Sequence, residues 1–390
     1  MNKTLKTVLS IILCIILITV GDAFIDSLNL EEKLTRFALK TQNAKYDIDF
    51  ENEFASKTMY YYNSLDENSK AAYRDMYAAV TNFEEKYTLD VTSADMRDVF
   101  MAVLYDNPEI FWLKTDYKFY DYENYVVFEP QYHFSAEEAR KMSNELENKV
   151  NNILSMASVY DTPYEKELFF HDYICTNVVY DEATYGTVGG SAHNALINGA
   201  SVCEGYARAM QILLDQAGIY NYLIIGDATD DEGTEPHMWN IVQLDGINYH
   251  VDVTWDDLED YSEPSHLYFN INDTLMSGDH LNFEPEINNC FSLSHNYYFM
   301  NGTYLISFNS FSDLSSVCGN VLKSGNNYVE FRFQNKSDYQ KALKAMDNNS
   351  GFFKFVDSAV KSSNRNLNTD EIEYYTEDEL QYICIVFKEG

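Results

Sequence analysis

The chain has 390 residues, of which 62 are acidic and 27 are basic, so its formal net charge is −35. A negative charge of this size repels phosphate backbones and anionic lipid surfaces, which excludes nucleic acid as a partner. The 32 tyrosines and 24 phenylalanines exceed what a disordered acidic chain carries, so we expect packed cores.

The first residues predict export. Lys3 and Lys6 precede an apolar run over 8–20, and small residues follow it. This order is typical of a secretory signal peptide over residues 1–23, because the apolar run is shorter than the roughly 20 residues of a comfortable membrane span. An uncleaved N-terminal anchor is the alternative. We therefore expect a secreted or cell-surface protein that meets a membrane only through this segment.

The length predicts two or three further units, and residues 24–160 are expected to be the first of them. This unit should be mainly helical with a short β insertion. Its expected elements are amphipathic helices over 68–87 and 94–105, two short strands within 117–132, and a long helix over 136–157 capped by Ser135.

A second unit is expected over residues 161–285. It should open with a helix from Tyr164 to about Thr176, after the Thr162-Pro163 pair. His171 falls on this helix and is expected to be a packing histidine whose ring nitrogens are satisfied by hydrogen bonds.

A reactive thiol is predicted at Cys203. Ser201 and Glu204 stand three residues apart before an apolar helical pattern, which is typical of a capping box, and Gly218 is expected to end the helix. With Ser201 as N-cap, Cys203 is the second helical residue, where free backbone N–H groups and the helix dipole favour the thiolate. The alternative is a structural cysteine that packs as a small hydrophobe.

A hairpin follows the thiol helix. Asp245-Gly246 is a strong two-residue turn signal between expected strands over 237–244 and 247–254. The turn pairs Leu244 with Ile247 and so fixes which residues share a face.

This register places His237, Trp239, His250 and Asp252 on one face of the hairpin. His237 and Asp252 are then diagonal neighbours, within reach of a hydrogen bond between the imidazole and the carboxylate. The other face is apolar except for Asn240. A longer loop or a bulge would move Asp252 to that other face.

The last unit, residues 286–390, is expected to be a small α/β accessory module that packs on the core. Holding a substrate or a wall component is the alternative role. Its expected elements are strands over 297–308 and 328–333, a helix over 337–346 and a final strand over 382–387.

Together these residues supply what acyl transfer through a cysteine needs. Cys203 would be the nucleophile, His237 the general base and then acid, and Asp252 the group that orients the imidazole and stabilises its charged form. The amino-acid sequence of residues 198–207, 237–240 and 249–257 resembles that of the transglutaminase-like superfamily. The resemblance covers about residues 165–275.

The resemblance implies an α+β papain-like core, in which the helix bearing the cysteine packs on an antiparallel sheet bearing the histidine and the aspartate. It also implies a thioester acyl-enzyme formed from a glutamine side chain or a peptide carbonyl. The substrate would then be a protein or peptide, for which the cell surface is one candidate location. Water as acceptor gives a protease or deamidase, whereas an amine gives a transglutaminase.

Other residues of this site are less defined. The backbone N–H of Cys203 is the expected oxyanion donor. Tyr180, Asn194 and Trp239 are weak candidates for the second donor, and a structural role is the simpler expectation for each. We expect His250 to line the substrate, because its register places it on the His237 face.

The sequence predicts no metal and no cofactor. It has no His-Glu-x-x-His, no paired Cys-x-x-Cys and no calcium-loop spacing. After removal of residues 1–23 five cysteines would remain, an odd number that leaves at least one thiol unpaired within the chain.

Three functions follow as hypotheses. The leading one is an exported thiol acyltransferase or hydrolase that acts on protein or peptide amides. The second is a catalytically silent transglutaminase-like module that binds peptides or serves at a surface. The third is a structural surface protein whose aromatic accessory regions do the work.

Overall fold

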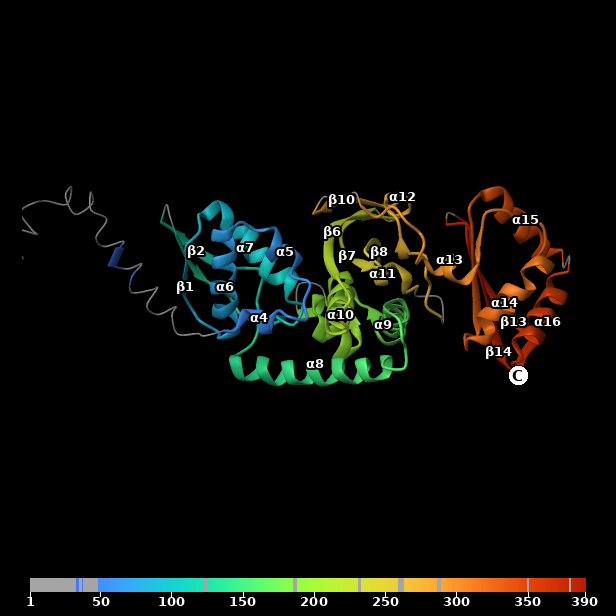
Figure 1. The fold of residues 1–390 in the computed structure, drawn as a ribbon, viewed down its shortest axis with the longest axis horizontal. Coiled ribbons are helices and arrows are strands. Elements are labelled where there is room, and N and C mark those ends of the chain that lie inside the picture. Colours follow the sequence, from blue (N-terminus) through green and yellow to red (C-terminus); the bar gives the residue numbers. More distant parts are fainter. Residues whose placement is uncertain are drawn as a thin grey trace, which may run out of the picture. The chain divides into compact units, whose positions relative to one another are not determined.

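The computed structural model describes 33, 34, 37, 48–122, 125–184, 188–230, 233–258, 263–285, 289–348, 351–378 and 380–390 (Figure 1). The expected signal segment, 1–23, lies outside these residues. Within the described part of the chain, no helix combines the length and the apolar character that crossing a membrane requires.

The chain divides into two compact units, and the division falls within one long helix. The first unit contains Met1–Ala55 and Met59–Ala139, and the second contains Ser56–Thr58 and Arg140–Gly390. The expected borders after residues 160 and 285 do not coincide with this division and stay predictions.

The first unit combines helices with a three-stranded antiparallel sheet of order β1-β3-β2. Its elements are α4 (Phe50–Glu53), α5 (Tyr60–Ser64), α6 (Glu67–Thr81), β1 (Tyr87–Leu89), α7 (Ser93–Asp106), β2 (Lys118–Asp121) and β3 (Val126–Glu129). The two short strands and the second helix are confirmed. The helix expected to reach Tyr87 ends instead at Thr81, because Phe83 has a left-handed φ of 56° and Tyr87 starts β1.

Two helices with side-chain caps follow. In α8 (Ala136–Ala157), Ser135 and Glu138 bond each other's backbone N–H, as expected for a capping box. In α9 (Pro163–Asn177), Thr162 and Glu165 form the same reciprocal cap, at 2.9 and 3.2 Å. Both predicted helices are confirmed.

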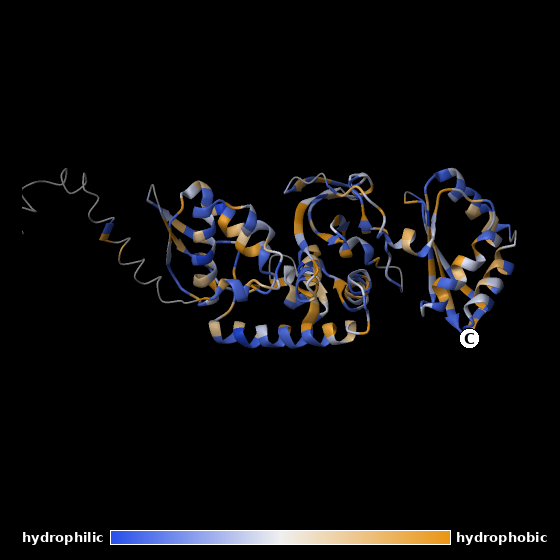
Figure 2. Cartoon of the chain, in the orientation of Figure 1, coloured by the Kyte–Doolittle hydropathy of each residue, from blue (hydrophilic) through white to orange (hydrophobic). Residues whose placement is uncertain are grey.

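The core of the second unit is an antiparallel five-stranded sheet of order β10-β6-β7-β8-β9. Its strands are β6 (Asn221–Thr229), β7 (Thr234–Leu244), β8 (Ile247–Val251), β9 (Phe269–Ile271) and β10 (His280–Glu284), joined by α11 (Val253–Asp256) and α12 (Asp273–Met276). Apolar residues run along these strands (Figure 2). The mixed α+β architecture that we expected is confirmed.

Helix α10 (Cys203–Gln216) packs against β6 and β7 of this sheet. It is preceded by a short parallel pair, β4 (Val179–Tyr180) and β5 (Ala200–Ser201). Three single-turn elements lie nearby, namely η1 (Glu182–Thr184), η2 (Val188–Gly190) and the π-helical η3 (Asn194–Asn198). Asn240, the polar residue on the apolar face of β7, donates to the Ala207 carbonyl at 3.0 Å and so ties the sheet to α10.

The register expected for the hairpin is confirmed from Asn240 opposite Val251 to Leu244 opposite Ile247. The second strand, however, ends at Val251 and not at Thr254. It ends there because the Asp252 carboxylate accepts from the backbone N–H groups of Thr254 and Trp255 and so caps α11.

Residues after 289 build a four-stranded sheet of order β11-β12-β14-β13 with helices packed on it. The elements are α13 (Tyr297–Asn301), β11 (Tyr304–Leu305), η4 (Phe311–Leu314), α14 (Ser315–Lys323), β12 (Tyr328–Phe333), α15 (Lys336–Asp347), α16 (Phe352–Ser363), β13 (Leu367–Glu377) and β14 (Tyr382–Glu389). Of the strand expected over 297–308, only β11 is confirmed, and its first part is wrong. Asn296 caps a helix there, and Gly302 ends it with a left-handed φ of 67°.

Candidate active site

Cys203 is the first residue of α10. Val202 is the N-cap and makes no side-chain cap bond, which corrects the expectation that Ser201 caps the helix. Ser201 is held in β5 instead, and its hydroxyl donates to the Gly189 carbonyl. Cys203 therefore lies one position nearer the N-terminus of the helix than expected, where its backbone N–H has no acceptor within the helix. The expected helix end is confirmed by Gly218, with a φ of 71°.

Gly205 allows the close approach of β5 to α10. A Cβ at Gly205 would lie 1.8 Å from the Ser201 Oγ and 3.0 Å from the Gly189 carbonyl oxygen. Only a residue without a side chain fits between α10 and the strand that leads into it.

His237 lies on β7 and points its Nε2 at Asp252 Oδ2, 2.6 Å away. Burial lowers the pKa of His237, but the charge and the hydrogen bond of Asp252, with a smaller contribution from Cys203, raise it to about 10. Since Nε2 is taken by the carboxylate, Nδ1 is the ring nitrogen left for the Cys203 sulfur. Cys203 is 9% exposed and His237 is 7% exposed, so both side chains are almost completely shielded from solvent.

Asp252 is fully buried and fully hydrogen-bonded. Its Oδ1 accepts from the backbone N–H groups of Thr254 and Trp255 at 3.0 and 3.2 Å. Burial raises the pKa of Asp252, but the charge and hydrogen bond of His237 and the hydrogen bond of His280 lower it well below its usual range. The carboxylate is therefore held ionised and fixed in orientation.

His280, the first residue of β10, is a site residue that the sequence did not indicate. Its Nε2 lies 3.0 Å from the same Asp252 Oδ2, and its Nδ1 lies 2.6 Å from Asp279 Oδ1. Burial lowers the pKa of His280, but these two carboxylates raise it above its ordinary value. No local signal could have found it, because β10 reaches the site by pairing with β6.

Trp239 stacks on the His237 imidazole, with ring centroids 5.9 Å apart and planes 22° apart. Its indole N–H donates to His250 Nδ1 at 3.0 Å, and His250 Nε2 lies 3.0 Å from Asp273 Oδ1. The one hydrogen-bond donor of the Trp239 side chain is therefore engaged by His250 inside the sheet. His250 is fully buried with both nitrogens bonded, which corrects the expectation that it lines the substrate.

The remaining two candidates for the oxyanion donor differ in their surroundings. The Asn194 amide donates to the Ala200 carbonyl and accepts from Asn198 at 2.6 Å, so it braces the turn before β5. Tyr180 is half-buried on β4, directly opposite Ser201 in the strand pair that leads to the nucleophile. Of the side chains proposed for this role, Tyr180 is thus the one that pairs with the strand leading into α10, opposite Ser201.

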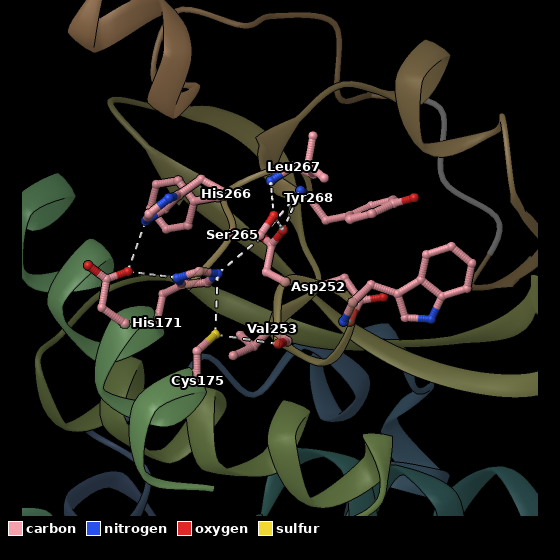
Figure 3. Close-up of polar contacts among 12 residues, drawn as sticks. His171, Cys175, Asp252, Val253, Ser265, His266, Leu267 and Tyr268 are labelled. Atoms are coloured by element: carbon pink, nitrogen blue, oxygen red, sulfur yellow. Dashed lines mark hydrogen bonds and ion pairs between the residues drawn. The ribbon is translucent and has the colours of Figure 1, made fainter. Parts of the chain in front are cut away.

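His171 is a fully buried histidine with both ring nitrogens bonded, as expected. Its ring nitrogens lie 3.0 Å from Asp172 and 3.1 Å from Asp256 (Figure 3). Cys175 is 4.0 Å from the same ring and donates to the Val253 carbonyl at 3.6 Å. Burial raises the pKa of the Cys175 thiol to about 12, so this second cysteine and histidine pair lacks a reactive thiol.

A thiol at the start of a helix, with an imidazole and a carboxylate on neighbouring elements, is the set of side chains that a Cys-His-Asp triad requires. Residues 154–253 match the family model of the transglutaminase-like superfamily. This part of the chain is therefore a transglutaminase-like domain, and the predicted resemblance is confirmed.

Two solved structures are similar at a low level. One is a TGase crystal structure, with 12% identity and a TM-score of 0.26 over 46% of this chain and 53% of that chain. The other is a candidate cysteine protease from Cytophaga hutchinsonii, with 13% identity and a TM-score of 0.24 over 36% of this chain and 61% of that chain. The chain thus spans less than two thirds of either structure. No curated protein matches the sequence.

Proposed function

We propose that the chain is a thiol-dependent enzyme that cleaves or exchanges amide bonds of proteins or peptides through a thioester on Cys203. The observation that carries the proposal is the buried 2.6 Å contact between His237 and Asp252, with Cys203 contributing to the environment of the same imidazole. The domain match supports the thiol-dependent class.

The acylation step follows from this geometry. The Cys203 sulfur attacks the amide carbonyl, and the backbone N–H groups at the start of α10 stabilise the resulting oxyanion. The proton held on His237 Nδ1 passes to the departing nitrogen, which leaves as ammonia or as an amine. Asp252 keeps its own charge throughout and stabilises the imidazolium before the transfer.

Deacylation reverses these roles. Neutral His237 takes a proton from water or from a primary amine as that molecule attacks the thioester carbonyl, and the Cys203 sulfur departs. Water gives deamidation or proteolysis, and an amine gives a cross-link. We propose Tyr180 as the second oxyanion donor, since it pairs with Ser201, two residues before Cys203.

Incubation of the purified chain with glutamine-containing peptides, with and without a primary amine, tests this function by mass. Ammonia loss with amine incorporation, ammonia loss with water gain, and backbone cleavage are three distinct products. Cys203→Ser should abolish all of them, and Cys175→Ser should not, because burial raises the pKa of the Cys175 thiol and keeps it unreactive. Absence of all three products would favour the silent binding module.

We also propose that the enzyme acts outside the cytoplasm, on the strength of the signal-like residues 1–23. A protein or peptide at the cell surface is the substrate class that fits such a location. Mass analysis of the mature chain after expression with its own N-terminus tests export. A chain that retains residue 1 and stays inside the cell contradicts it.

A further inference from the structure

Among the described residues, three groups of side chains bring possible metal ligands within 4.8 Å of one another. They are His171, Asp172 and His266; His237, Asp252 and His280; and His250, Asp273 and Cys290. The second group is the proposed catalytic site. The other two differ in where their imidazole protons lie.

The His250 group is unsuited to a metal. The Trp239 indole can only donate a hydrogen bond, so His250 Nδ1, 3.0 Å from it, must accept. The proton of a neutral His250 ring is then on Nε2, the nitrogen that faces Asp273. No lone pair is left there for an ion.

The His171 group has the opposite arrangement. His171 Nε2 lies 3.1 Å from Asp256 and His266 Nδ1 lies 2.5 Å from Glu330, and both carboxylates can only accept. In a neutral ring the proton therefore faces away from Asp172. The lone pairs of His171 Nδ1 and His266 Nε2 then converge on Asp172 Oδ1, at 3.0 and 2.9 Å.

The rings of His171 and His266 lie side by side, with centroids 5.2 Å apart (Figure 3). Both rings and the carboxylates of Asp256 and Glu330 are fully buried, whereas the Asp172 side chain is 34% exposed. An ion can therefore reach this otherwise buried group from solvent at the Asp172 side chain.

Charge balance calls for two positive charges at this place. The carboxylates of Asp172, Asp256 and Glu330 carry −3, which is costly to bury beside two neutral rings. Two imidazolium protons or one divalent cation change this to −1.

We infer that His171, Asp172 and His266 form a binding site for one first-row divalent transition-metal ion of the Zn²⁺ type. Two imidazole nitrogens and one carboxylate oxygen suit such ions, whereas Ca²⁺ and Mg²⁺ prefer oxygen ligands alone. Carboxylates on the remote ring nitrogens are the usual outer-shell partners of metal-bound histidines. Through Glu330 the site joins α9 and the loop before β9 to β12.

The test uses the full chain, stripped with a chelator and titrated with Zn²⁺ and Co²⁺. One equivalent of Zn²⁺ should remain after dialysis. The Co²⁺ form should show visible d–d bands without a thiolate charge-transfer band, because no sulfur is a ligand. A thiolate band would instead assign the ion to Cys290 or Cys203 and overturn the inference, as would the absence of stoichiometric binding.

Variants locate the ion. Asp172→Asn should weaken Zn²⁺ binding at least tenfold, and the outer-shell change Glu330→Gln should weaken it by about 10- to 100-fold. The matched control Asp273→Asn, which alters a second partly exposed aspartate paired with a histidine, should bind as the unaltered chain does. Equal binding by Asp172→Asn, or loss confined to Asp273→Asn or His280→Gln, overturns the inference. Metal binding needs no turnover, so its failure is distinct from failure of the proposed enzyme.

Discussion

His237 and His280 meet on a single carboxylate oxygen, Asp252 Oδ2, at 2.6 and 3.0 Å. One carboxylate oxygen thus interacts with two imidazoles. Each of these hydrogen bonds weakens the interaction of the oxygen with the other ring. His280 is therefore a positioning residue that limits how strongly Asp252 holds the proton on His237.

Replacing His280 with Gln should raise the pH at which His237 loses its proton, because a nearby positive charge and a competing hydrogen bond are removed. The alkaline limb of the kcat/KM profile should move to higher pH. Loss of a charge-assisted hydrogen bond of about 1.5–3 kcal/mol corresponds to a fall of about 10- to 100-fold in kcat/KM. His295→Gln, at a partly exposed histidine paired with Asp245, is the control and should leave the limb in place. An unmoved limb in His280→Gln would remove His280 from this role.

Asp252→Asn should nearly abolish turnover. The amide cannot stabilise the imidazolium, and the analogous change in a serine protease triad costs about 10⁴-fold in kcat. Single-turnover rates with a glutamine peptide measure the effect. A loss below about tenfold would mean that Asp252 has a structural role alone.

His237 should make stability depend on pH. Its folded pKa of about 10 lies above the unfolded value of about 6.5. Its contribution is therefore complete below about pH 6.5 and is lost as the pH rises through about 10. Thermal unfolding between these pH values should show a falling Tm, and His237→Gln should flatten part of the fall. An equal fall of Tm with pH in His237→Gln would show that folding does not raise the pKa of His237.

Gly205→Ala should destabilise the chain, since its Cβ would lie 1.8 Å from Ser201 Oγ. Overpacking of this kind costs about 1–3 kcal/mol, measurable by denaturant unfolding. The control is Gly278→Ala, where the nearest atom would be 3.3 Å away and the change should be smaller. Equal effects of the two substitutions would argue against the close approach of β5 and α10.

Tyr180→Phe should lower kcat by about 10²- to 10³-fold if its hydroxyl is the second oxyanion donor. Alkylation of Cys203 should be unchanged, because no oxyanion forms in that reaction. Equal kcat values for the variant and the unaltered chain would leave the second donor to the backbone at the start of α10.

Local rules predicted the part of the site that lies within one hairpin and one helix. The turn at Asp245-Gly246 fixes the pairing up to Val251, and this was enough to bring His237 to Asp252. The same rules failed where a longer-range contact intervened. Ser201 looks like a helix cap, yet pairing of β5 with β4 takes it into a strand.

Residues brought in by distant pairing could not be predicted at all. His280 comes from β10, at the edge of the sheet beside β6, and its neighbours in the sequence carry no catalytic pattern. His266 and Glu330 lie 64 positions apart. The spacing of known metal motifs therefore gives no hint of the His171 cluster.

The most direct test of the central claim is the rate at which a thiol-directed electrophile modifies Cys203 at neutral pH, followed residue by residue by mass. All five described cysteines are buried and free, so accessibility alone does not single out Cys203. Selective modification of Cys203, slowed by about 10²-fold or more in His237→Ala, is the predicted result. Slow labelling that is spread over the cysteines and indifferent to His237→Ala would contradict the account.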